Sequence, residues 1–315
     1  MELDFKQISL LVLGAFALAI VIVALTSTNF SNLGNINSGQ TNSATCVGVV
    51  HLTGDIAYSD SPDPASTNVV TQGEIQQAFS NAESDPNAGA ILLYINSPGG
   101  SAAASKEIYD IVRSSNKPVV AYLGELAASG GYYAASAANY IVANPDTITG
   151  NIGARTELIS YADLEAKLGI VDQGLVTGSL KDVGAPYRNA TSQDKAILQG
   201  ILDESFNVFK NDVENARGSR LNNTLFAIDL DGRPLGAKEA LASGLIDQIG
   251  NETTAIAKAA SLANMTIDPT NTNSLCPEDP SPTLQDYLSQ LASSFGSGVG
   301  AALISPSPTL KYQYG

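Results

Sequence analysis

The sequence predicts an α/β fold, and three observations support this class. Residues 46–54 and 88–96 are short, largely apolar runs of the kind that form strands of a sheet. Residues 101–115 follow the second run and carry apolar side chains such as Ile108 and Val112 at helical spacing. Strands and helices then continue to alternate, which is typical of an α/β sheet. With 44% hydrophobic residues, the chain has enough apolar side chains to form a core.

The elements follow in a regular order, and two of the connections between them are glycine loops. The predicted strands are residues 46–54, 88–96, 117–124 and 139–145, with a short strand near 250. The predicted helices are residues 71–84, 101–115, 128–138, 192–217 and 254–264, with a short helix within 231–250. Glycine pairs at 99–100 and 130–131 each lie between a strand and the helix that follows it.

The N-terminal part predicts a membrane anchor. Residues 8–25 are apolar except for Ser9, and as a helix they would be about 27 Å long, enough to cross the hydrocarbon core. Lys6 precedes this stretch and no Lys or Arg follows it for dozens of residues, so residues 1–7 are expected in the cytoplasm and the rest outside. A cleaved signal peptide is the rival interpretation, but no clear A-x-A site follows the apolar stretch.

Three further segments complete the domain organisation. Residues 26–45 are polar and uncharged and predict a flexible stalk. Residues 46–265 contain the alternating elements and predict the folded domain. Residues 266–315 are rich in Ser, Pro and Gly and predict a C-terminal tail rather than a second membrane span.

Charge and cysteine content exclude some classes of function. The formal net charge is −15 and no cluster of Lys or Arg is visible, so we expect no nucleic-acid partner. Cys46 and Cys276 have no CxxC spacing, so a zinc site built on cysteines is excluded. The two cysteines form a disulfide or remain two thiols, and the sequence does not decide between these. No motif indicates a metal or cofactor.

The single histidine limits the kinds of catalytic site that the chain can hold. A Ser-His-Asp triad would have to use His51. His51 lies in a predicted strand, where a lone histidine is more often a packed strand residue than a base.

The two glycine loops are the best candidates for a catalytic site. Ser129 precedes Gly130 and Gly131 at the predicted start of a helix, where its hydroxyl is either exposed at the positive end of the helix or simply an N-cap. Gly99 and Gly100 end another strand, and glycines there let backbone N–H groups face a developing negative charge. Two such loops together could place donors beside a hydroxyl.

A serine nucleophile also needs a base, and with one histidine a lysine is the better candidate. A lysine acts as a base only where its surroundings leave the amine neutral. Lys181 lies in a Gly- and Pro-containing loop predicted to follow a strand, but residue chemistry alone does not select it among the lysines.

Four sequence stretches resemble the signal peptide peptidase A family. They are YINSPGGSAAASKEIYD, KPVVAYLGELAASGGYYAASAANYIVANPDTITGNIGA, GSLKDVGAPYRNAT and PLGAKEALASGLIDQIG, and they have the order and spacing of that family. The resemblance covers roughly residues 47–260 and is specific because the motifs are long. It implies a ClpP/crotonase-like ββα spiral and a serine endopeptidase with a Ser-Lys dyad.

The resemblance also assigns residues. It implies Ser129 as nucleophile, Lys181 as general base, and Gly99, Gly100 and Gly130 as the oxyanion hole. One departure concerns TGNIG, where the family usually has TGSIG. Asn151 therefore stands in place of a serine that normally helps to hold the lysine, and its carbonyl oxygen could accept the same hydrogen bond.

Larger members of this family have two tandem repeats, whereas this chain has one. The resemblance thus implies a homo-oligomeric ring in which the serine of one subunit can meet the lysine of its neighbour. Extended hydrophobic peptides, such as signal peptide remnants in the membrane, are the implied substrates. Two other functions are compatible with the fold, namely a non-catalytic peptide-binding scaffold and a crotonase-like enzyme acting on acyl-CoA.

Overall fold

The computed structural model describes residues 44–58 and 68–277. The predicted cytoplasmic segment 1–7, the anchor 8–25, nearly all of the stalk 26–45 and residues 278–315 of the tail lie outside these described residues. Among the helices that are described, none is both long enough and apolar enough to span a membrane.

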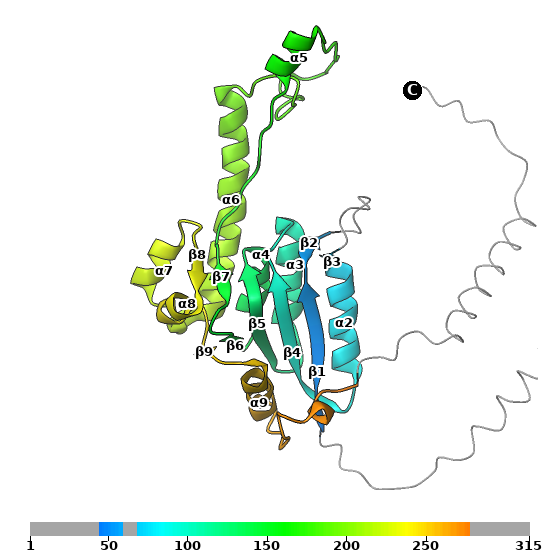
Figure 1. The fold of residues 1–315 in the computed structure, drawn as a ribbon, viewed down its shortest axis with the longest axis vertical. Helices are drawn as coiled ribbons and strands as arrows, with labels where there is room; N and C mark the ends of the chain where they lie inside the picture. Colours follow the sequence, from blue (N-terminus) through cyan, green and yellow to red (C-terminus); the bar gives the residue numbers. More distant parts are fainter. Residues whose placement is uncertain (1–43, 59–67, 278–315) are drawn as a thin grey trace, which may run out of the picture. The chain divides into compact units, whose positions relative to one another are not determined.

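A mostly parallel sheet forms the centre of the fold, which confirms the predicted α/β class (Figure 1). The strand order is β1-β4-β5-β6-β9, and every pair along this path is parallel. The strands are β1 (Cys46–Thr53), β4 (Ala88–Ser97), β5 (Val119–Ala128), β6 (Tyr140–Ala143) and β9 (Gln248–Ile249). Because side chains from helices pack against both faces of β4 and β5, these strands are buried on both sides, which explains their nearly continuous apolar sequences.

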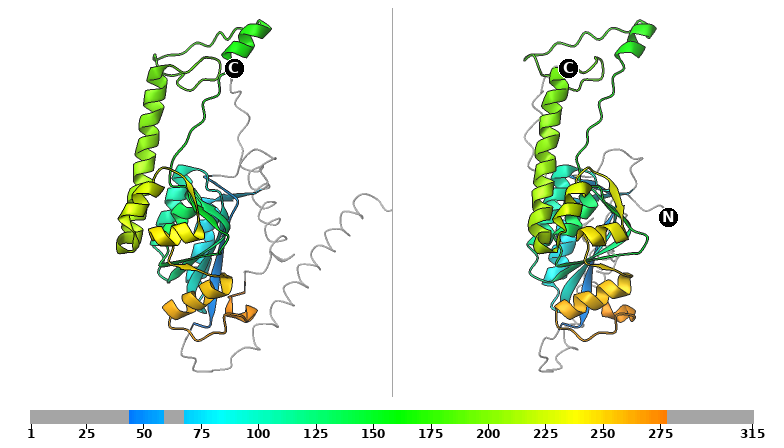
Figure 2. Two further views of the ribbon diagram at one scale, coloured as in Figure 1. Left: turned by 60° about the vertical axis from the view of Figure 1, so that its left-hand side comes forward. Right: turned by 90° about the vertical axis from the view of Figure 1, so that its left-hand side faces the viewer.

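Helices cover both faces of this sheet (Figures 1 and 2). One face packs against α2 (Gln72–Ser84), α3 (Ala102–Arg113) and α4 (Gly130–Ser136). The other face packs against α9 (Glu252–Leu262). The strands alternate accordingly: Leu93 belongs to the first cluster of buried side chains and Leu92 to the second.

Four short strands extend this framework beyond the elements that the sequence predicts. β7 (Ile148–Gly150) pairs in parallel with the end of β5, and β8 (Pro234–Gly236) pairs antiparallel with β7. β2 (Asp55–Ala57) and β3 (Val69–Thr71) form a separate parallel pair. Each has only three residues, too few to show a periodicity of its own.

The long predicted helix 192–217 is present as α6 (Ser192–Arg217). Thr191 caps it through a capping box with Asp194. Figure 1 shows that α6 begins at the end of the helix that is farther from the sheet. The start of α6 lies beside α5 (Ala162–Leu168) and the loops that flank α5. We call residues 154–200 the arm. The sequence predicted a strand directly before the loop that contains Lys181. This strand is absent, because residues 170–176 form no ladder of hydrogen bonds with another strand.

Large apolar side chains on the arm are exposed. They include Ile159, Leu168, Val171 and Leu175, of which Leu175 is fully exposed. An exposed apolar surface of this extent usually marks a site of association.

The remaining elements connect α6 to the end of the described chain. They are η1 (Gly218–Arg220), α7 (Asn223–Asp229), α8 (Ala237–Ser243) and η2 (Thr272–Ser274). Arg217 at the end of α6 is fully buried and forms a two-pronged ion pair with Asp247, which also accepts a hydrogen bond from the Ile141 N–H. This pair fixes α6 against β6.

Residues 266–277 pack on the sheet beyond the predicted domain boundary at 265. The Cys276 N–H donates to the Val47 carbonyl at 2.9 Å, and Leu275 pairs with Val47 in a parallel bridge. Cys46 and Cys276 form a disulfide, the first of the two alternatives that the sequence left open.

Candidate active site

Ser129 sits on a sharp turn between β5 and α4. Its backbone has φ 52° and ψ −122°, a conformation that costs a residue other than glycine about 1–3 kcal/mol and that often occurs at functional sites. Its N–H donates to the Gly150 carbonyl on β7 at 2.9 Å, and its carbonyl accepts from the Tyr133 N–H at 2.8 Å. The turn is therefore fixed on both sides by backbone hydrogen bonds.

The Ser129 hydroxyl does not act as a helix cap. It forms no capping hydrogen bond with α4, although Ser129 occupies the N-cap position. No hydrogen bond from this hydroxyl to any other described residue is present. The side chain is half-buried and stands at the positive end of α4.

The loop that contains Gly99 and Gly100 lies directly against the start of α4. A Cβ placed on Gly99 would be 2.6 Å from the Gly130 nitrogen and 2.9 Å from the Ser129 Cβ. Gly99 and Gly100 have φ values of 100° and 156°, and a Cβ on Gly100 would be 2.1 Å from the Ile56 carbonyl oxygen. Only glycine fits at either position.

Ser97 and Ile56 hold this loop in place, although no sequence motif marks either residue. The buried Ser97 hydroxyl donates to the Gly54 carbonyl at 2.6 Å and accepts from the Gly99 N–H at 3.1 Å. The Ile56 N–H donates to the Gly99 carbonyl, and the Ile56 carbonyl accepts from the Ser101 N–H.

Two backbone donors remain available beside Ser129. Within the described ranges 44–58 and 68–277, no acceptor is bonded to the N–H of Gly100 or of Gly130. Both predicted glycine loops thus meet at Ser129, as the paired motifs led us to expect. Such donors can stabilise the negative oxygen that develops when a hydroxyl adds to a carbonyl group.

Asn151 lies next to this site because Gly150 is bonded to Ser129. Its side-chain N–H donates to the Gly232 carbonyl at 2.6 Å, and its backbone N–H donates to the Arg233 carbonyl at 3.0 Å. These bonds fix the side chain through its nitrogen. Its carbonyl oxygen accepts no hydrogen bond from the part of the chain that the structure describes.

Lys181 lies on the arm, and one chain does not bring it to Ser129. The loop that contains it precedes α6, whose first residues lie away from the sheet (Figures 1 and 2). Lys181 is exposed, and its side chain makes no ion pair or hydrogen bond with the described residues. The structure therefore brings Ser129 together with Gly100 and Gly130, whereas the N–H of Gly99, the third predicted donor, is bonded to the Ser97 hydroxyl. The predicted base, Lys181, lies apart from these residues.

The loop of Lys181 is tied to α6 by a cluster of charged residues that the sequence did not single out. The Arg188 guanidinium donates to both carboxylate oxygens of Asp182, at 2.8 and 3.0 Å, and to its carbonyl at 3.0 Å. Arg188 also pairs with the buried carboxylate of Asp194. Hydrogen bonds from Arg188 hold the pKa of both carboxyls below the usual range, and the Thr191 N–H adds to this effect at Asp194.

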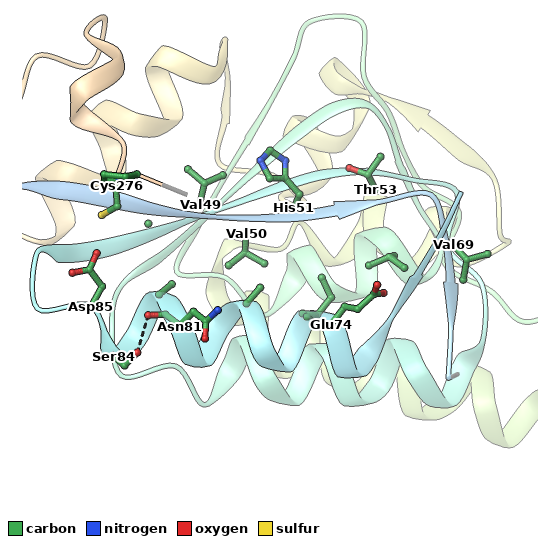
Figure 3. Close-up of a pocket in the computed structure, with 16 residues that line it drawn as sticks. Val49, Val50, His51, Thr53, Val69, Glu74, Asn81, Ser84, Asp85 and Cys276 are labelled. Carbon is green, nitrogen blue, oxygen red and sulfur yellow. Dashed lines mark hydrogen bonds between the residues drawn. The ribbon is translucent and has the colours of Figure 1, made fainter. Parts of the chain in front are cut away.

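A separate cavity of about 680 Å³ lies along β1 and α2 and contains none of the predicted site residues. Figure 3 shows Val50 directed toward α2, with His51 on the opposite side of β1. The His51 ring packs against the Tyr94 ring of β4, with centroids 5.4 Å apart. His51 thus has the surroundings of a strand residue, as its sequence context indicated.

One group of candidate metal ligands exists among the described residues, and it does not suit a metal. It consists of Cys46, Asp85 and Cys276, and the disulfide joins both of its sulfurs. Metal-binding thiolates are therefore not available there.

The sequence profile of peptidase family S49 matches residues 111–266, which include Ser129 and Lys181. A putative protease of Synechocystis is 34% identical over 199 residues, which are 62% of this chain and 70% of that protein. This chain belongs to peptidase family S49.

Other relatives place this S49 member within the signal peptide peptidase A family. A putative signal peptide peptidase of Enterococcus faecium is 32% identical over 53% of this chain and 49% of its own length. A putative protease of Methanocaldococcus jannaschii is 37% identical over 58% of this chain. The matched region spans only 59% of that protein. The profile of Clp proteases matches residues 64–147, in agreement with the parallel sheet.

Proposed function

We propose that this S49 member is a serine endopeptidase in which Ser129 is the nucleophile and Lys181 the general base. The observation that carries the proposal is the Ser129 turn, where an uncapped hydroxyl on a backbone of positive φ lies against the Gly99 loop. The N–H groups of Gly100 in that loop and of Gly130 in the turn have no acceptor among the described residues. Strain of this kind persists only where the surroundings enforce it, here through Gly99 and Gly150.

The proposed reaction proceeds through an acyl-enzyme. The neutral Lys181 amine takes the proton of the Ser129 hydroxyl as the oxygen adds to the carbonyl carbon of the peptide. The N–H groups of Gly100 and Gly130 donate to the resulting oxyanion, where loss of one donor typically lowers kcat about 10²–10³-fold. The C–N bond then breaks and Lys181 returns the proton to the leaving amine. Water, deprotonated by Lys181, hydrolyses the ester.

The dyad is proposed to form between subunits of a homo-oligomeric ring with a ClpP/crotonase-like ββα spiral in each subunit. The exposed apolar side chains of the arm support this assembly, because they would be buried against a neighbouring subunit. In the ring, the arm of one subunit would carry Lys181 to the Ser129 of the next. Asn151, whose carbonyl oxygen is available, would accept a hydrogen bond from that lysine and orient it.

The proposed location is the outer side of the cell membrane, with residues 8–25 as a single anchor. The disulfide between Cys46 and Cys276 supports an oxidising compartment, because such bonds form and persist outside the cytoplasm. A ring anchored there would act on extended hydrophobic peptides, including signal peptide remnants.

The test is peptide hydrolysis by the full-length chain in detergent. The substrate is an internally quenched peptide with an apolar residue before the cleaved bond, and the proteins are the wild type, Ser129→Ala and Lys181→Ala. We expect both variants to lose activity by several orders of magnitude. Full activity of Lys181→Ala would exclude this lysine as the base. A wild type that neither cleaves peptides nor reacts with a serine-directed phosphonate would favour the peptide-binding scaffold.

Mixing the two inactive variants tests the shared dyad. Ser129→Ala and Lys181→Ala subunits, dissociated and reassembled together, should regain activity if one subunit's serine works with another's lysine. Reassembled oligomers without activity, from variants that each assemble normally, would place both residues of the dyad in one chain.

A further inference from the structure

The arm contains a partly buried cluster of charged residues beside Lys181. Most arm residues are exposed, yet Asp194 is 1% exposed and the side chains of Arg188 and Asp182 are about 27% and 20% exposed. Burying a charge in this way is costly unless the charges pair with good geometry. The planar guanidinium of Arg188 bonds both oxygens of Asp182, which is the geometry that an arginine supplies and a lysine does not.

Asp182 is the residue directly after Lys181, and this proximity creates a chemical problem. A carboxylate that pairs with a lysine favours its charged form, which cannot act as a base. In the structure Arg188 occupies both carboxylate oxygens of Asp182 and its carbonyl oxygen as well. The Lys181 side chain has no ion pair with any residue of the described ranges, although a carboxylate is adjacent in the sequence.

We propose that Arg188 is a positioning residue that binds the Asp182 carboxylate and so prevents it from pairing with Lys181. The inference rests on the proposed function, because it matters only if Lys181 is the base. The charged groups that face Asp182 are Arg188 and, from α6, Asp194. Lys195, also on α6, lines a small cavity together with Arg188.

The geometry of the cluster also explains why the partner of Asp182 is an arginine that binds two carboxylates. Arg188 bonds Asp194 at the first turn of α6 while it bonds Asp182, so its guanidinium cannot swing away with the loop. Asp194 is in turn fixed by the Thr191 N–H at 2.9 Å. The ion pair between Arg188 and Asp194 would be enough to connect the loop to α6. The additional ion pair with Asp182 involves the carboxylate beside the proposed base.

The test compares pH–rate profiles of kcat/KM for full-length proteins on the quenched peptide. In Arg188→Met, Asp182 is free to pair with Lys181, and we expect the acid limb of the profile to move up by about one pH unit or more. Adding Asp182→Asn to Arg188→Met should return the limb toward the wild-type position, because the stray carboxylate is gone. If Arg188→Met fails to fold, Arg188→Lys replaces it in the test. Arg188→Lys keeps the positive charge but cannot form two parallel hydrogen bonds with the Asp182 carboxylate, so the acid limb should move in the same direction by a smaller amount.

Arg155→Met is the matched control. Arg155 is exposed on the same arm and pairs with Glu157, so this variant changes the net charge equally without touching the cluster. Its acid limb should stay at the wild-type position. An Arg188→Met protein whose rate falls equally at all pH values, with no rescue by Asp182→Asn, would overturn the inference and leave Arg188 a purely structural tie. If Lys181→Ala is fully active, the proposed function itself fails, which is a separate outcome.

Discussion

At the scale of single residues, the site depends on the close approach of two glycine loops. A Cβ on Gly130 would lie 2.2 Å from the Ser105 Oγ and 3.1 Å from the Ser105 Cβ, and Ser105 is buried on α3. Alanine normally favours a helix over glycine by about 1 kcal/mol. Here the clash with Ser105 outweighs that preference, because overpacking a buried contact costs about 1–3 kcal/mol.

Gly130→Ala should therefore lower both stability and activity. α4 must shift away from α3, which moves the Gly130 N–H and the Ser129 turn together. We expect a decrease of about 1–3 kcal/mol in the free energy of unfolding. We also expect kcat to fall about 10²-fold or more, as when an oxyanion donor is lost. Denaturant unfolding and peptide hydrolysis measure the two effects.

Two variants control this prediction. Ser105→Ala removes the atom 2.2 Å away, so adding it to Gly130→Ala should restore part of both losses. Gly200→Ala, in α6, meets nothing within 4 Å and should stabilise the chain slightly without changing kcat. Equal losses in Gly130→Ala with and without Ser105→Ala would show that the clash is not the cause.

At the scale of elements, we expect the junction between the Lys181 loop and α6 to depend on pH. Hydrogen bonds from Arg188 depress the pKa of Asp182 and of Asp194 in the folded chain. Since both values lie below those of the unfolded chain, about 4, their stabilisation is complete above about pH 4 and is lost as pH falls through the folded values. The first turn of α6 should then loosen in acid before the sheet unfolds.

Hydrogen-exchange protection of the first turn of α6, followed from pH 6 to pH 2.5, measures this loosening. Protection should fall steeply at the acid end in the wild type. In Asp194→Asn it should be low already at pH 6 and change little. Asp203→Asn, which alters an exposed carboxylate of the same helix, should behave as the wild type does. Constant wild-type protection down to pH 2.5 would contradict the role assigned to the cluster.

Some of these elements could be predicted from the sequence alone and others could not. The helix 192–217 and the strands β1, β4 and β5 were predictable because their apolar periodicity is local. The contact between Ser129 and Gly99 was predictable because both loops follow strands that end at the same edge of the sheet. β7 and β8 were missed because three-residue strands owe their existence to long-range pairing, which leaves no local pattern.

Arg188 was missed for a related reason. Its partners Asp182 and Asp194 are each six residues away, a spacing at which side chains are not neighbours in a helix, and only the folded loop brings them together. One signal was present: Thr191 and Asp194 form a capping box that fixes where α6 begins. No sequence pattern indicated that Lys181 lies apart from Ser129 within one chain, because this separation depends on the conformation of the whole arm.

At the scale of the whole molecule, the disulfide joins the start of the sheet to the last described segment. Cys46 begins β1, and Cys276 follows the residues that pair with Val47. The bond spans a sequence separation of 230 residues, so it removes much of the freedom of the unfolded chain. For a loop of this length, the chain-entropy estimate is about 5 kcal/mol, and measured values for disulfides are typically about 2–4 kcal/mol.

Reduction should accordingly destabilise the chain without dismantling the site. We expect a reductant to lower Tm by about 5–15 °C, since 1 kcal/mol corresponds to about 2–4 °C in a domain of this size. The double variant Cys46→Ala, Cys276→Ala should start from the lower Tm and no longer respond to the reductant, which separates loss of the bond from other effects of reduction. Ser129 and its donors belong to the opposite end of β4 and β5, so hydrolysis well below the new Tm should stay close to that of the oxidised chain. An unchanged Tm on complete reduction would mean that the pairing of Cys276 and Leu275 with Val47 holds this segment without the covalent bond.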